Sequence, residues 1–299
     1  MSAPTTIKVA MLAGFGLLLL GVFALVLIPR PVSIIAPLPK LKAIASSTPL
    51  LVVIGHSVQG RDIEAVSYGT GPNHLLFVGG IHGGYEWNAV VLAYRVMDYI
   101  QANPSVIPAN LTVTIIPDVN PDAVFKAVGK EGSFTAADVP VEKNLSVERF
   151  NANGVDLNRN FDCKWQSKSM WQNKTVSAGT APFSEPESVA LRDFILQDNP
   201  IAVVFWHSQA DGVYASQCAS GILPGTMDLM NAYARVSGYS AIKVFDAYPT
   251  TGAADDWLAS VGIPAVSVEL STHQSIDWDK NLAGVQALLH LYGTTTPVR

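Results

Sequence analysis

From residue 50 onward, apolar runs of strand length alternate with stretches of helical period. The predicted strands span residues 50–55, 75–81, 111–117, 201–206 and 265–270. The predicted helices span about 85–102, 184–198, 226–238 and 279–292. Strands that are almost continuously apolar are buried on both faces, and their alternation with helices is typical of an α/β domain. We therefore expect a mixed, mostly parallel central sheet with helices on both faces.

The most apolar stretch of the chain lies near its N-terminus. Residues 9–28 carry no charge, and a helix of that length spans about 30 Å, the thickness of a bilayer core. We predict one transmembrane anchor there, after a short tail at 1–8. The alternative is a cleaved signal sequence, although the run exceeds the ~7 to 15 apolar residues usual in one. A proline-rich stalk at 29–48 would then lead to a catalytic domain at 49–299.

Composition supports a link to a membrane and argues against a nucleic-acid partner. Charged residues make up 14% of the chain, against roughly 25% in ordinary soluble domains, and the mean hydropathy is +0.27. The net charge is −5, and no block of basic residues is present to neutralise phosphates. We expect attachment to a membrane through the N-terminal helix and no binding to nucleic acid.

Candidate chemistry gathers at the carboxyl ends of the predicted strands, where α/β folds place their functional residues. His82 and Glu86 follow one strand, His207 follows another, and Glu269 lies near the end of a third. Two histidines and a glutamate form the ligand set of a hydrolytic zinc site, which leaves the fourth position to water. Glu269 is then a candidate base for that water. The sequence suggests no partner for the other histidines, His56, His74, His273 and His290.

Between these strand ends, residues 149–161 read RFNANGVDLNRNF, a cluster of arginines and amides suited to gripping a carboxylate. Here the sequence resembles the zinc carboxypeptidases of the M14 type, the group of carboxypeptidase A and the murein peptide amidases. The resemblance covers residues 50–293 and keeps the family's order. Its further marks are IGHSVQGRDI at 54–63, NPDA at 120–123, PFSEPES at 182–188, WHS at 206–208, Tyr248 and Glu269.

The resemblance implies a zinc site. His82, Glu86 and His207 would bind one Zn²⁺ per chain. Glu269 would serve as general base and then as general acid for the leaving amine. Asp156 is a candidate partner that orients a ligand histidine, and a turn cap is the alternative role for its side chain.

The resemblance also implies how a substrate would be held. Arg149 would stabilise the oxyanion, Asn158 and Arg159 would bind the free carboxylate of a peptide's C-terminal residue, and Tyr248 would close over it. Asp255 falls where relatives that remove basic residues carry an aspartate. It would attract lysine, arginine or the amino group of diaminopimelate in a cell-wall peptide, unless it only caps the segment that follows.

The spacing of the predicted metal ligands departs from the family pattern. The usual H-x-x-E is H-x-x-x-E here, because a residue is added before Glu86. Both spacings face one side of a helical turn, and Gly83-Gly84 can absorb the addition, so we expect ligation to survive. If Glu86 is displaced instead, the protein is an inactive module that binds peptide or cell wall. Murein peptide amidase and N-acyl amino acid deacylase are the alternative reactions on the same scaffold.

The two cysteines bear on location. Cys163 and Cys218 both fall near the rim of the predicted active site, and a disulfide between them would require an oxidising compartment. Free thiols are the alternative. More basic residues follow the segment 9–28 than precede it, which by charge alone would leave the domain in the cytoplasm. Because the body resembles a secreted peptidase, we expect the extracytoplasmic face, or secretion if the segment is cleaved.

Overall fold

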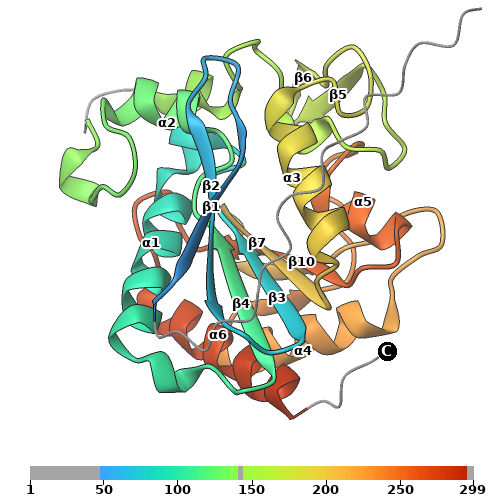
Figure 1. Cartoon of the computed structure of the whole chain (residues 1–299). Coiled ribbons are helices and arrows are strands. Elements are labelled where there is room, and N and C mark those ends of the chain that lie inside the picture. The colour runs from blue at the N-terminus through green and yellow to red at the C-terminus, as the bar shows by residue number, and fades with distance from the viewer. Residues whose placement is uncertain (1–47, 141–143, 295–299) are drawn as a thin grey trace, which may run out of the picture. The chain divides into compact units, whose positions relative to one another are not determined.

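An eight-stranded mixed sheet forms the centre of the residues that the structure describes, 48–140 and 144–294 of a computed structural model (Figure 1). In spatial order its strands are β1 (Leu50–His56), β2 (Asp62–Gly69), β4 (Leu111–Ile116), β3 (Asn73–Val78), β7 (Ala202–Ser208), β10 (Ala265–Leu270), β8 (Gly212–Ala215) and β9 (Ser240–Ile242). The central strands β4, β3, β7 and β10 run parallel, whereas β1, β2 and β8 pair antiparallel with their inner neighbours. The mixed, mostly parallel sheet predicted from the apolar runs is confirmed.

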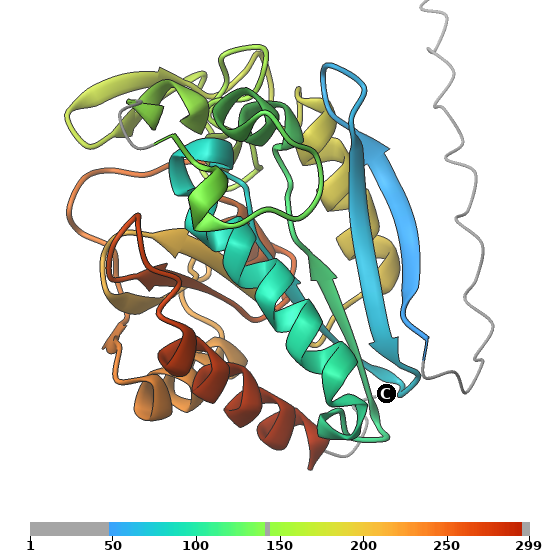
Figure 2. The ribbon, with the colours of Figure 1, turned by 90° about the vertical axis from the view of Figure 1, so that its left-hand side faces the viewer.

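Helices cover both faces of this sheet. They are α1 (Trp87–Ala102), α2 (Pro121–Val128), α3 (Pro186–Asp198), α4 (Pro224–Ser237), α5 (Ala254–Ser260) and α6 (Trp278–Gly293). Strand side chains alternate between two cores, so that Leu75 and Phe77 pack with α1, α4 and α6, while Leu76 and Val78 pack with α3 and α5. Figure 1 shows α1 and α3 on opposite sides of the sheet, and Figure 2 shows α1 and α6 covering one face together.

Several predicted boundaries were wrong by two or three residues, and for two of them the reason is local. The strand expected at 75–81 ends at Val78, because Gly79 and Gly80 turn the chain away and Gly80 has a φ of +71°. The helix expected from 85 begins at Trp87, after a 3₁₀ turn, η1 (Gly83–Glu86). The small hairpin of β5 (Lys168–Trp171) and β6 (Lys174–Ser177) was not predicted, because neither strand contains an apolar run.

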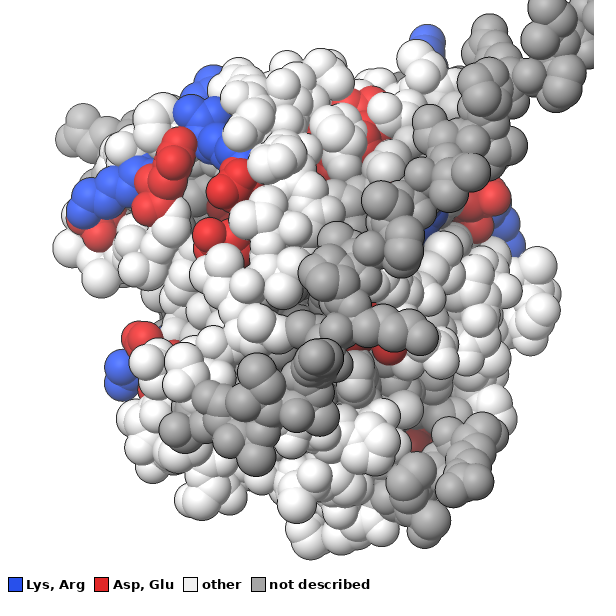
Figure 3. Space-filling view, viewed as in Figure 1, with Lys and Arg blue, Asp and Glu red and all other residues white. Residues whose placement is uncertain are grey.

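The predicted tail at 1–8, the anchor at 9–28 and the stalk up to residue 47 lie outside the described residues, as do 141–143 and 295–299. Among the helices that are described, none combines the length and the apolar character needed to cross a bilayer. The surface drawn in Figure 3 is sparsely charged, and most of its basic side chains lie beside acidic ones. The ion pair of Arg61 with Glu131, at 3.0 Å between Nε and Oε1, is an example of such pairing.

Candidate active site

A cavity of about 320 Å³ opens at the carboxyl ends of β3, β7 and β10. This is the edge of the sheet where functional residues were expected. The sequence-predicted residues that line it are His82, Glu86, Arg149, Asn158, Arg159, His207, Tyr248, Asp255 and Glu269. Asp156 is fully buried behind the wall of the cavity. The sequence therefore located this cavity from residues that are up to 187 positions apart.

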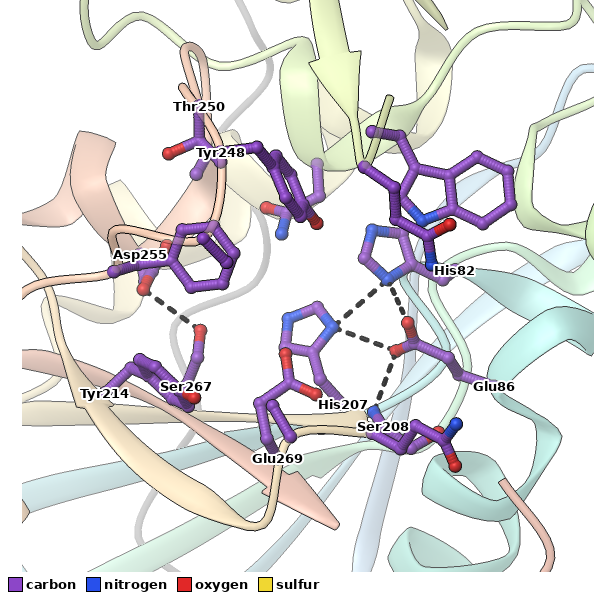
Figure 4. Close-up of a pocket in the computed structure, with 18 of the residues that line it drawn as sticks. His82, Glu86, His207, Ser208, Tyr214, Tyr248, Thr250, Asp255, Ser267 and Glu269 are labelled. Atoms are coloured by element: carbon purple, nitrogen blue, oxygen red, sulfur yellow. Dashed lines mark hydrogen bonds and ion pairs between the residues drawn. The ribbon is translucent and has the colours of Figure 1, made fainter. Parts of the chain in front are cut away.

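The predicted metal ligands converge on one point. Nδ1 of His82 lies 2.7 Å from Oε1 of Glu86, Nδ1 of His207 lies 3.0 Å from Oε2, and the two imidazole nitrogens are 3.2 Å apart. Figure 4 shows the three side chains turned toward one another. Burial alone would raise the pKa of the Glu86 carboxyl, but the two imidazoles outweigh it and hold that pKa well below its usual value.

This cluster fits a zinc ion by chemistry and by size. Imidazole nitrogen and carboxylate oxygen are the donors of hydrolytic zinc sites, and all three side chains are buried. A tetrahedron with arms of ~2.1 Å has edges of about 3.4 Å, only slightly longer than the observed separations. A small outward shift of the side chains is therefore enough to accommodate the ion.

The H-x-x-x-E spacing is accommodated by the 3₁₀ turn η1. Gly83 has a φ of +47°, and a Cβ there would stand 2.4 Å from Cβ of Ala123. A Cβ on Gly84 would stand 2.2 Å from Cβ of Ala127. The two glycines thus let η1 press against α2 and bring Glu86 back to His82. The expectation that the glycines absorb the added residue agrees with this geometry.

Two buried charged side chains, Asp156 and Arg149, contact the metal-ligand cluster. Oδ1 of Asp156 lies 3.5 Å from Nε2 of His82, and Oδ2 accepts a hydrogen bond from Nε of Arg149 at 2.9 Å. Burial would raise the pKa of Asp156, but Arg149 and Arg159 outweigh burial and lower it. The guanidinium of Arg149 also stacks over the ring of Trp171 at 4.8 Å, which fixes its plane. Asp156 also caps a turn, since Oδ1 accepts from the amide of Asn158 at 3.1 Å.

Asn158 and Arg159 are held rigidly at the cavity wall. Nε and Nη2 of Arg159 donate to the carbonyl of Met170 on β5, at 3.1 and 3.0 Å. Oδ1 of Asn158 accepts from the amide of Ala254 at 2.8 Å. Because that oxygen is engaged, the amide nitrogen of Asn158 is the group left to face a ligand. Such fixed donors suit recognition of a carboxylate.

Asp255 and Tyr248 lie at the other end of the cavity from Ser208 (Figure 4). Oδ2 of Asp255 accepts a hydrogen bond from Oγ of Ser267 at 3.0 Å. Helix α5 has Ala253 as its N-cap and no side-chain cap, so the interpretation of Asp255 as a helix cap was wrong. Tyr248 is half-buried and packs edge to face on Phe245 at 4.9 Å.

Glu269 lies on β10 directly beside His207 on β7, because the two residues are paired in register across the parallel strands. Burial, together with the nearby carboxylates of Glu86 and Asp255, outweighs His207 and Arg149 and raises the pKa of Glu269 to about 7. A carboxyl with such a pKa can gain and lose a proton near neutral pH.

A disulfide crosses the rim of the cavity. Cys163 and Cys218 are bonded, with their Cα atoms 6.0 Å apart, and no free cysteine occurs in the described chain. The bridge joins the segment that carries Arg159 to the loop after β8. In that loop, the amide of Gln217 donates to Asp256 at 2.8 Å.

Tyr85, His273 and Trp171 are among the cavity-lining residues to which the sequence assigned no role. Tyr85 is the residue just before Glu86, and its ring lies 4.5 Å from that of His273 and 5.2 Å from that of Trp171. The position of His273, four residues after Glu269, could have signalled its place beside the site. Trp171 had no such signal, because it lies on a short hairpin whose strands contain no apolar run.

This fold and site are typical of a metal-dependent hydrolase, with a buried metal-ligand cluster, an adjacent carboxyl of raised pKa and arginines that line the cavity. The family model for zinc carboxypeptidases matches residues 38–282. The chain therefore belongs to the zinc carboxypeptidase family, and the cluster of His82, Glu86 and His207 is suited to hold the Zn²⁺ ion of that family.

Similar proteins include a γ-D-glutamyl-L-diamino acid endopeptidase and a murein peptide amidase. The chain is 26% identical over 240 residues to γ-D-glutamyl-L-diamino acid endopeptidase 1 of Lysinibacillus sphaericus, which is 73% of this chain and 60% of that protein. It is 39% identical to murein peptide amidase A of Escherichia coli (strain K12) over 69 residues, 20% of this chain and 28% of that protein. The chain thus spans only part of these curated relatives.

Solved structures show the same fold. Murein-tripeptide amidase MpaA from Escherichia coli O157 superposes with a TM-score of 0.59 at 22% identity, covering 85% of this chain and 96% of that one. Bovine thrombin-activatable fibrinolysis inhibitor, in complex with tick carboxypeptidase inhibitor, gives 0.64 at 20% identity, covering 81% and 90%.

Proposed function

We propose that this protein is a metallocarboxypeptidase that hydrolyses the C-terminal bond of peptides with a free terminal carboxylate. The observation that carries the proposal is that one cavity contains both the His82, Glu86 and His207 cluster and the fixed donors of Asn158 and Arg159. If the terminal carboxylate is bound by these donors, the peptide bond that joins the terminal residue to the rest of the substrate would lie at the metal held by the three ligands.

The predicted site residues would then have the following roles. His82, Glu86 and His207 would hold the zinc, which supplies Lewis acidity to water and to the scissile carbonyl. Glu269 would accept a proton from the attacking water and return it to the leaving amine. Arg149, fixed by Asp156, would donate to the oxyanion that develops on the carbonyl.

The rest of the cavity would bind the terminal residue. Asn158 and Arg159 would bind its carboxylate, and Tyr248 would cover it. Asp255 supports a preference for a basic terminal side chain, because its carboxylate lines the cavity next to Ser267. Lysine, arginine and diaminopimelate all carry a suitable cation.

Murein peptide amidase action is the second candidate. It is supported by the likeness to cell-wall enzymes and by Asp255, since diaminopimelate offers both a carboxylate and an amino group. An N-acyl amino acid deacylase and an inactive binding module are the other outcomes that the experiment below separates.

We also propose that the catalytic domain, residues 49–299, is held at the extracytoplasmic face of a membrane by residues 9–28, or is secreted if these are cleaved. The uncharged segment supports attachment or export, and the disulfide of Cys163 with Cys218 supports an oxidising compartment.

The test is a panel of peptides ending in lysine, arginine, leucine, phenylalanine or diaminopimelate, with N-acyl amino acids beside them, read by mass spectrometry. We expect loss of single terminal residues that stops with chelator and falls at least ~10²-fold in Glu269→Gln, which keeps the shape and zinc ligands of the site. Release of only diaminopimelate would favour the amidase, and release of only acyl groups the deacylase. Peptide binding without turnover would identify a binding module.

A further inference from the structure

His273 is fixed by a chain of hydrogen bonds that begins in the core. Nδ2 of Asn88 donates to the carbonyls of Thr272 and Ser275, each at 2.7 Å. This orients the amide of Asn88, so its Oδ1 is left as an acceptor. The hydroxyl of Ser208 donates to that oxygen at 2.9 Å. Asn88 and Ser208 are both buried, so the chain is shielded from competing water.

This series of hydrogen bonds determines which nitrogen of His273 carries the proton. Oγ of Ser208 lies 2.7 Å from Nδ1 of His273. A hydroxyl has one proton, and that of Ser208 is already given to Asn88, so Nδ1 of His273 must donate. Burial also lowers the pKa of His273, which favours the neutral ring. A neutral ring protonated at Nδ1 presents an unprotonated Nε2, and this atom has no hydrogen-bond partner among the described residues.

The position of His273 points to the acyl side of the substrate. Figure 4 shows Asp255 and Tyr248 on one side of the metal-ligand cluster and Ser208 on the other. His273 is hydrogen-bonded to Ser208. If the terminal residue occupies the Asp255 side, the chain upstream of the scissile bond must leave past Ser208. His273 lines the cavity there, and its ring lies 4.5 Å from that of Tyr85.

We propose that His273 is a specificity-determining residue whose Nε2 accepts a hydrogen bond from the backbone N–H upstream of the scissile bond. The inference rests on the proposed peptidase function and adds a requirement to it, an amide donor on the acyl side. The peptide backbone is the ligand class that supplies such an N–H at a fixed distance from the scissile carbonyl. Tyr85, the residue added before Glu86, forms the aromatic wall of this subsite.

The experiment removes the N–H without adding bulk. The zinc enzyme is given N-benzoylglycyl-lysine and O-benzoylglycolyl-lysine, in which an ester oxygen replaces the upstream N–H while the scissile amide is unchanged. We expect wild type to prefer the first about tenfold in kcat/KM, mainly through KM, because one hydrogen bond that binds substrate and transition state alike is lost. In His273→Phe, which keeps a ring against Tyr85, the preference should fall to about one.

Two further variants separate the hydrogen bond from general damage. His273→Gln should restore part of the preference, because its amide can donate to Ser208 and still accept from the substrate. The matched control is His290→Phe, an exposed position in the last turn of α6, which should keep the full preference. Zinc content and thermal unfolding are measured for each variant, so that a misfolded protein is recognised.

The outcomes are distinct. A preference that persists in His273→Phe with full zinc content would overturn the inference and leave the peptidase function intact. Failure of wild type to cleave either substrate, or any peptide of the panel, would contradict the function itself. Independently of turnover, ¹⁵N chemical shifts of His273 should show Nδ1 protonated and Nε2 unprotonated, and the reverse pattern would also overturn the inference.

Discussion

At the scale of single residues, the charged groups of the active site shift one another's pKa values. Glu269 is the clearest case, because burial and the carboxylates of Glu86 and Asp255 raise its pKa, whereas His207 and Arg149 lower it. A base must be deprotonated to act, so activity should fall as the pH falls through this pKa. Bound zinc adds positive charge and lowers the pKa below the value of about 7 for the protein alone.

We therefore expect the acid limb of the pH profile of kcat/KM to have its midpoint below pH 7. Asp255→Asn removes a negative charge that raises the pKa of Glu269, so the limb should move to still lower pH. A pH profile measured with a peptide ending in leucine checks this without involving the preference for basic residues. A limb that stays in place or moves to higher pH would contradict the electrostatic account.

The role of Asp255 in selectivity gives a second prediction. Asp255→Ala should reduce kcat/KM for a peptide ending in lysine by about 10- to 100-fold, the loss expected for one hydrogen bond to a charged group. A peptide ending in leucine should lose little. Competition between the two peptides measures the ratio directly, and Asp279→Ala, an exposed acid in the first turn of α6, is the control. Equal losses on both peptides would mean that Asp255 only supports the fold.

At the scale of elements, the site depends on how closely η1 packs against α2. Gly84→Ala would bring a Cβ to 2.2 Å from Cβ of Ala127, so η1 must move and carry Glu86 with it. We expect at least a tenfold weaker zinc affinity, measured by competition with a chelator. Adding Ala127→Gly makes room and should recover part of the affinity. An unchanged zinc affinity in Gly84→Ala would show that η1 can move away from α2 without displacing Glu86.

How much of this could be predicted from the sequence also depends on the element. His82, His207 and Glu269 were found because long apolar runs mark central strands, and parallel strands bring their carboxyl ends together. Glu86 followed from helical spacing. The hairpin that fixes Arg159 through Met170 could not be found, because its strands are four residues long and have no apolar run. His273 follows Glu269 by only four residues, but its hydrogen-bond chain could not be predicted, since Ser208 and Asn88 come from two other elements.

At the scale of the whole molecule, the disulfide closes a loop with a sequence separation of 55 residues that includes α3, β7 and β8. A cross-link of this span stabilises the native state by about 4 kcal/mol in the chain-entropy model, through restriction of the unfolded chain. We expect Cys163→Ser together with Cys218→Ser to lose stability of this order, measured by urea unfolding of the zinc-loaded protein. An unchanged unfolding midpoint would mean that packing alone holds the rim.

Attachment to a membrane is also a property of the whole chain. The full chain should sediment with membranes and resist extraction by salt and alkaline carbonate, whereas residues 49–299 should stay in the supernatant. Cleavage near the start of the stalk, read by mass spectrometry of the mature N-terminus, would instead identify residues 9–28 as a signal sequence.

The in-register pairing of Glu269 with His207 bears on how the enzyme can be redesigned. Neighbouring strands are held about 4.8 Å apart by their backbone hydrogen bonds, so the spacing between these two positions does not depend on the loops around the cavity. Libraries that randomise the rim between β9 and α5, where Tyr248 lies, can therefore sample new substrate preferences while the backbone that carries Glu269 and His207 stays unchanged. For directed evolution, the rim that carries Tyr248 can thus be varied separately from the strands that carry Glu269 and His207.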